Sequence, residues 1–209
     1  MPTLRPFRDY DEKDVINLFT VSGTTLPCNK GTLVKIAGPG MTLNNPDAVE
    51  MLGNMGDFSV SNVVAQRYGV IPKITPITAQ TDTVLGMTLF DMRETDENGI
   101  PLKYNPRKAA EMEACISGQA VPVVVKGIFA YSGITTGNSL TGAVTAGAKL
   151  YAGANASLTT QNYNAYTTTG TTGGLPINVS VSGRPIAIAL GNSDAFAVTV
   201  VRFDAGGLY

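Results

Sequence analysis

The chain has 209 residues, a net charge of −1 and a charged share of only 15%, where about 25% is usual in soluble domains. It contains no histidine and no tryptophan, which excludes Ser-His and Cys-His nucleophile pairs and imidazole metal ligands. The small net charge gives no long-range attraction to nucleic acid or to an anionic membrane. We therefore expect a protein that is not an enzyme, uses no cofactor or metal, and has an uncharged polar surface suited to packing against other subunits.

Residues 1–13 are predicted to form an extended N-terminal arm. Two prolines oppose a helix there, and the apolar residues are too few for the segment to fold on itself. In one interpretation the segment is a frayed terminus. In the other it lies on a neighbouring subunit or on a capsid protein and contacts it through apolar and basic side chains, namely Leu4, Arg5, Phe7, Arg8 and Tyr10.

Residues 14–104 are predicted to form a first β module. Its strands are indicated by runs of β-branched and aromatic residues between glycines and prolines, at 15–21, 31–36, 60–68, 73–77 and 83–90. Asp14 leaves an alternative open for the first run, because aspartate also caps short helices.

An acidic stretch follows over residues 91–99. It lacks the spacing of an EF-hand calcium loop, since it has no D-x-D-x-D-G run and no glutamate at the twelfth position. Asn98 and Gly99 instead suit the positive-φ positions of a tight turn. We predict a solvated turn here.

One short α-helix is predicted over residues 105–118. Asn105 can cap its start, Pro106 suits the first helical position, and Gly118 suits the left-handed position at its end. An apolar stripe at helical spacing is expected to pack across a sheet, and it consists of Ala109, Met112 and Ile116.

Residues 119–209 are predicted to form a second β module. Apolar runs indicate its strands, at 120–129, 146–152, 184–190 and 195–203. Residues 158–174 are polar and form a loop or a long hairpin, and residues 191–194 form a hairpin turn. The fold is therefore predicted to be mainly β, with β-barrel or β-sandwich modules, one short α-helix and an extended arm. The two modules are either separate or interleaved in one domain.

A weak internal symmetry relates the two halves. Three strands of the first half resemble three of the second in the same order, the first set being 31–36, 84–90 and 121–128 and the second 148–152, 186–190 and 198–203. Duplication of a three-strand unit is one way to build a barrel or two stacked barrels. Similar β patterning without duplication is the alternative.

The remaining motifs carry no chemistry. The glycine-rich stretches lack both the dinucleotide fingerprint and the P-loop lysine. Cys28 and Cys115 have no CxxC spacing, and we expect both thiols to stay reduced in a chain that is not exported. Neither a signal peptide nor an apolar run of membrane-spanning length is expected.

The stretch from Gly118 onwards resembles the capsid decoration (cement) proteins of tailed bacteriophages. The resemblance lies in a Val-Pro-Val-Val-Val-x-Gly-Ile segment, a Thr-Ala-Gly-x-Lys-Leu-Tyr-Ala turn and strand, and two closing strands, at Val121 to Ile128, Thr145 to Ala152, Ile186 to Leu190 and Val198 to Phe203. Residues 83–90 with the acidic turn also resemble virion structural proteins of marine and cyanobacterial phages.

This resemblance implies a structural virion protein that binds the major capsid protein and itself, as a trimer, on the outer capsid surface after assembly in the host cytoplasm. From the net charge of −1 we expect contact with neither nucleic acid nor membrane. A tail-tube or baseplate component is the alternative, since it shares the β composition. A glycan-binding adhesin is less favoured, because tryptophan and an export signal are missing.

Overall fold

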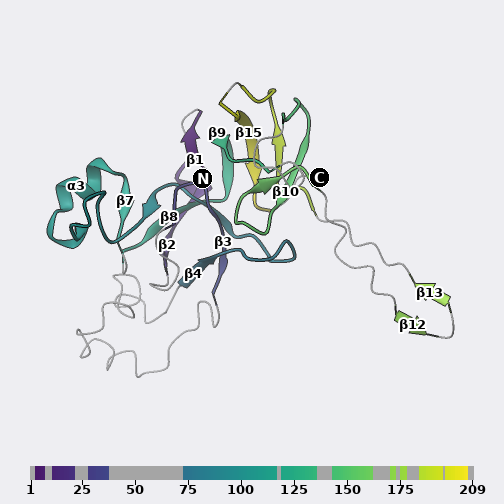
Figure 1. The fold of residues 1–209 in the computed structure, drawn as a ribbon, viewed down its shortest axis with the longest axis horizontal. Helices are drawn as coiled ribbons and strands as arrows, with labels where there is room; N and C mark the ends of the chain where they lie inside the picture. Colours follow the sequence, from purple (N-terminus) through teal and green to yellow (C-terminus); the bar gives the residue numbers. More distant parts are fainter. Residues whose placement is uncertain are drawn as a thin grey trace.

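The computed structural model describes residues 3–7, 11–21, 28–37, 73–116, 119–135, 143–161, 170–172, 175–177, 184–194 and 196–206. The fold is mainly β, as predicted, and its two main parts are a closed five-stranded barrel and a six-stranded sheet (Figure 1). The predicted strand at 60–68 and most of the predicted loop at 158–174 lie outside the described residues.

The barrel has the strand order β2-β4-β3-β5-β8. Its strands are β2 Val15–Val21, β3 Leu33–Ile36, β4 Lys73–Pro76, β5 Gly86–Thr88 and β8 Val121–Val124. β2 and β4 run parallel, and the other neighbours are antiparallel. Apolar side chains fill the interior, among them Phe19, Val34, Ile74, Val121 and Val123. A short 3-10 helix, η1 (Glu12–Asp14), precedes β2. The residues after Asp14 form a strand, and not the short helix that an Asp14 cap would begin.

The six-stranded sheet has the order β1-β9-β15-β14-β10-β11. Its strands are β1 Thr3–Pro6, β9 Lys126–Ser132, β10 Lys149–Ala152, β11 Leu158–Thr159, β14 Ala187–Ala189 and β15 Val198–Asp204. β9 and β15 pair along their whole length in antiparallel register. One two-stranded sheet, of β12 Gly170–Thr172 and β13 Leu175–Ile177, is separate from both.

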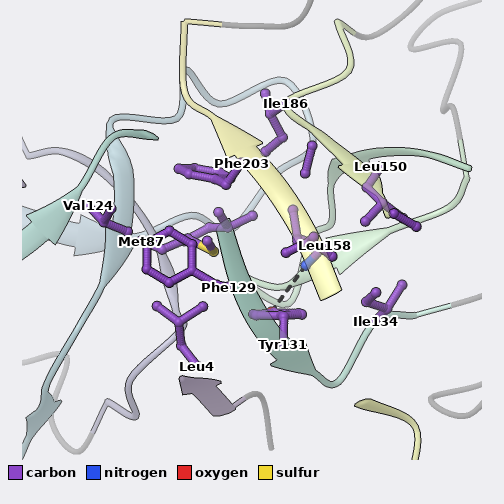
Figure 2. Close-up of a cluster of buried hydrophobic side chains, with 14 of the residues drawn as sticks. Leu4, Met87, Val124, Phe129, Tyr131, Ile134, Leu150, Leu158, Ile186 and Phe203 are labelled. Atoms are coloured by element: carbon purple, nitrogen blue, oxygen red, sulfur yellow. Dashed lines mark hydrogen bonds between the residues drawn. The ribbon is translucent and has the colours of Figure 1, made fainter. Parts of the chain in front are cut away.

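A single core joins the barrel to the sheet. Figure 2 shows Met87 and Val124 of the barrel beside Phe129 of β9. In the same cluster the Tyr131 hydroxyl accepts a hydrogen bond from the Leu158 backbone N–H at 3.3 Å. Because β8 completes the barrel and β9 begins the sheet directly after it, the chain passes from one to the other at residue 125 and not at 119.

Leu4 belongs to this core. It lies in β1, which is antiparallel to β9 with Leu4 opposite Tyr131, and only 2% of its surface is exposed. The prediction that Leu4 anchors the chain on a neighbouring subunit is therefore wrong. Strand alternation directs this side chain into the core of its own chain.

The two halves contain the same antiparallel unit. The barrel holds the order β3-β5-β8-β2, and the sheet holds β10-β14-β15-β9. The predicted correspondence of three strands is thus confirmed as topology, and β2 and β9 extend it to a fourth. The fifth barrel strand, β4, also has a counterpart, because β11 pairs antiparallel with β10 and forms a parallel bridge from Thr159 to Thr135, just after β9.

Hydrogen bonds repeat in matching positions. The backbone N–H of Gly31 donates to the Thr88 carbonyl at 2.7 Å, and that of Gly147 donates to the Ala189 carbonyl at 2.8 Å. Both glycines have a positive φ, of 85° and 83°, a backbone conformation that favours glycine.

A side-chain acceptor beside each glycine repeats as well. Asp91 Oδ1 accepts from the Lys30 N–H at 2.8 Å, and Asn192 Oδ1 accepts from the Ala146 N–H at 2.8 Å. These pairs fix which residue of one half corresponds to which residue of the other.

The helix begins as predicted and ends early. α3 spans Pro106–Glu111, and Asn105 Oδ1 accepts from the Lys108 N–H at 3.2 Å. A short 3-10 helix, η3 (Leu102–Tyr104), precedes it. Glu113 then adopts a φ of 49°, which the right-handed helix excludes.

After that reversal the chain forms β7 (Ala114–Cys115), which runs parallel to β6 (Asp91–Met92). The predicted end at Gly118 is therefore wrong. The predicted apolar stripe is wrong too, since α3 has no buried residue and Ile116 follows β7.

Candidate interaction surface

The acidic stretch contains a turn, as predicted. Asp96 Oδ1 accepts hydrogen bonds from the backbone N–H groups of Asn98 and Ile100, each at 2.8 Å. Gly99 has a φ of 80°, as an Asn-Gly turn requires. In the described part of the chain, no three acidic, cysteine or histidine side chains gather into a metal-binding group.

The two cysteines are free and buried. They lie on opposite sides of Met92, because Cys28 forms an antiparallel bridge to it and Cys115 pairs with it in parallel register. Each neighbouring strand is about 5 Å away, so the two Cα atoms lie too far apart for a disulfide without backbone movement. Burial raises the pKa of both thiols, that of Cys115 to about 11, which makes them poor nucleophiles at neutral pH.

One ion pair is built into the connection between β4 and β5. Asp82 Oδ2 lies 2.8 Å from Lys35 Nζ and accepts from the backbone N–H groups of Thr78 and Ala79. The hydrogen bond to Lys35 is the main cause that lowers the Asp82 pKa from 3.8 to about 2. The pair holds the loop between β4 and β5 against β3, which contains Lys35. No other ionisable group of the described residues forms an ion pair with either residue.

The side of the six-stranded sheet that faces away from the core presents the most distinctive surface. We call it the outer face. Alternation along each strand sends every second side chain there, while Leu4, Phe129, Tyr131, Val201 and Phe203 point into the core. Strand pairing then arranges the outer side chains in rows across the sheet.

The first row crosses four strands and reaches the residue directly after β1. Lys149 pairs with Ile188, Ile188 with Arg202, and Arg202 with Ile128. The row ends at Phe7, whose backbone N–H donates to the Ile128 carbonyl at 3.1 Å. Basic and apolar residues thus alternate over most of the row.

A second row runs beside it. Arg5 pairs with Ala130 and Ala130 with Val200, and the Leu190 N–H donates to the Val200 carbonyl at 2.7 Å. Phe7 is 63% and Leu190 49% exposed. Neither row contributes a residue to the two core clusters.

The outer face is basic. Its strands present four exposed basic residues, Arg5, Lys126, Lys149 and Arg202, and one half-buried acid, Asp204, so the face carries about three positive charges although the chain has a net charge of −1. No ion pair joins these basic residues to another residue in the part of the chain that the structure describes.

Two of the five arm residues singled out in the sequence lie on this face. Arg5 and Phe7 are exposed there, whereas Leu4 is buried beneath it and Arg8 and Tyr10 lie outside the described residues. The residues of β9, β10, β14 and β15 on the outer face are not predicted from the sequence. The alternation within 126–132 and 198–204 is visible in the sequence, but it does not reveal that these two strands lie side by side.

No family model matches the chain, and no curated protein matches it in sequence. None of the described helices has the length and apolar character to cross a membrane.

Proposed function

We propose that the protein is a structural virion component, a capsid decoration protein that binds the assembled lattice of a major capsid protein and stabilises it. The observation that carries the proposal is the outer face. On this face Phe7 and Leu190 are exposed, Ile128 and Ile188 are half-buried, and none of these four residues belongs to a core cluster. Such faces are typical of surfaces that bind another protein.

The rest of the molecule suits that role. The described residues form four ion pairs, and both cysteines are buried as free thiols. Neither kind of group places a nucleophile beside a base. A shared core joins the barrel to the six-stranded sheet, so a force applied to the sheet by a partner is transmitted to the barrel. A protein that binds only the assembled lattice stabilises it by mass action.

The test is binding to capsid shells that lack this protein. Purified protein should sediment with the shells and raise the temperature at which they release their contents. Unassembled capsid subunits serve as the matched control and should not bind. Binding to tail tubes in place of shells would support the tail component, and binding to glycans alone would support an adhesin. Either result would overturn the proposal.

A further inference from the structure

The barrel contains its own copy of the first row. Leu33 pairs with Met87, Met87 with Val124, and Val124 with Val15. The repeated hydrogen bonds equate these four positions with the row in the sheet, which in the same order consists of Lys149, Ile188, Arg202 and Ile128.

In the barrel this row is an interface. Leu33, Met87 and Val124 are each 0% exposed and belong to the core shared with the six-stranded sheet. The Leu33 N–H also donates across the boundary to the Ala156 carbonyl at 2.8 Å. The same face of this fold unit therefore binds a protein surface within the chain itself.

In the sheet the corresponding row lies outside both core clusters, with Lys149 and Arg202 exposed and Ile128 and Ile188 half-buried. Two of its four positions differ in chemical character from those of the barrel. Lys149 replaces the leucine and Arg202 replaces the valine, while Ile188 and Ile128 keep the apolar character of their counterparts. Full exposure to solvent does not account for the two isoleucines of the row. Burial like that of the barrel row would leave the charges of Lys149 and Arg202 unpaired. Both features fit a partner that covers the isoleucines and brings acidic groups to Lys149 and Arg202.

We propose that this row is a docking surface for a protein surface that presents carboxylates beside apolar side chains. The carboxylates pair with Arg202 and Lys149, and apolar groups pack against Ile128, Ile188 and Phe7. The proposal rests on the proposed function in one respect, since it takes the partner to be the capsid lattice.

Two other occupants fit the face less well. A second copy of the chain joined face to face would bring basic residues against basic residues, and like charges oppose such a contact. Single-stranded nucleic acid prefers several aromatic platforms for its bases. The two rows offer one aromatic residue, Phe7, whereas Ile128, Ile188 and Leu190 are aliphatic.

The experiment compares shell binding of three proteins. They are the wild type, the double variant Lys149→Glu with Arg202→Glu, and the control Lys103→Glu. Lys103 is exposed in η3 beside α3, and Figure 1 shows α3 at one end of the molecule, well away from β10. We expect the double variant to bind at least tenfold more weakly, the control to bind like the wild type, and all three to unfold at similar temperatures.

Carbodiimide coupling, which joins amines to carboxylates, should link Lys149 to an acidic residue of the capsid protein. Shell binding that the double variant retains would overturn the inference and leave the proposed function standing. Loss of binding by the control to the same extent would overturn it too, because the effect would then not depend on where the charge is changed.

A second arm applies where the wild type binds no shells, a result that overturns the proposed function by itself. A ten-residue peptide of alternating Glu and Leu is titrated into the labelled protein, and a Lys-Leu peptide serves as the control. Amide shifts confined to the row for the acidic peptide alone support the inference. Shifts elsewhere, or equal shifts with both peptides, refute it, as does preferential binding of single-stranded nucleic acid.

Discussion

Leu4→Ala should destabilise the protein by about 3 kcal/mol. Leu4 is 2% exposed, and the substitution removes three carbons from the core at about 0.8 kcal/mol each. The surroundings close the gap only in part, because the site is tight. A Cβ added at Gly31 would lie 3.1 Å from the Leu4 Cβ and 3.2 Å from the Tyr131 ring. A residual cavity therefore adds to the transfer cost.

The measurement is urea unfolding followed by circular dichroism, with Arg5→Ala as the control from the same strand. Arg5 is exposed, so its substitution should change the free energy of unfolding by less than about 0.5 kcal/mol. For a chain of this size the loss at Leu4 corresponds to a fall of about 6–12 °C in the melting temperature. Equal effects of the two substitutions would show that β1 does not pack on the core and would restore the free arm.

Three further substitutions test other parts of the structure. Asp82→Asn should cost about 1–2 kcal/mol above pH 5 after allowance for solvent screening, because the folded state lowers that pKa from 3.8 to about 2. The difference from wild type should vanish as pH falls from 4 to 2, and a pH-independent cost would contradict the ion pair. Gly31→Ala should lower the melting temperature more than Gly147→Ala. Both glycines have a positive φ, but only a Cβ at position 31 would press on Leu4. Equal falls in melting temperature would refute this prediction. Thr199→Val should raise the free energy of unfolding by about 1 kcal/mol, because the buried hydroxyl has no hydrogen-bond partner, and a loss measured by urea unfolding would show that it has one.

Local signals predicted the elements that depend on local contacts. The start of α3 follows from Asn105 and Pro106, whose roles as cap and first residue need no distant partner. The turn at Asp96 is equally local, since the carboxylate bonds to backbone two and four residues on. Most strands were also found, because β-branched runs between glycines mark them.

Features that depend on distant partners were not predictable. The helix is shorter than the sequence predicts because Ala114–Cys115 pairs with Asp91–Met92, some twenty residues earlier, and that pairing overrides the helical spacing. The burial of Leu4 cannot be predicted from neighbouring residues because its partner strand β9 begins more than one hundred residues later. An edge strand with one deeply buried leucine has the same sequence pattern as a free extended segment.

The outer face combines both kinds of information. Its composition is local, since alternation along a strand shows that Arg202 and Val200 share one side. The inference that the face binds a partner comes from comparing the two repeated units. Only the equivalence of Val124 with Arg202 shows that a position closed by the chain's own core in one unit is open and charged in the other. A duplicated fold unit begins with two copies of every interface, and the copy that the chain does not bury must become polar or bind another molecule. Here the open copy has gained two charges and kept two isoleucines, which is a composition suited to a partner of opposite charge.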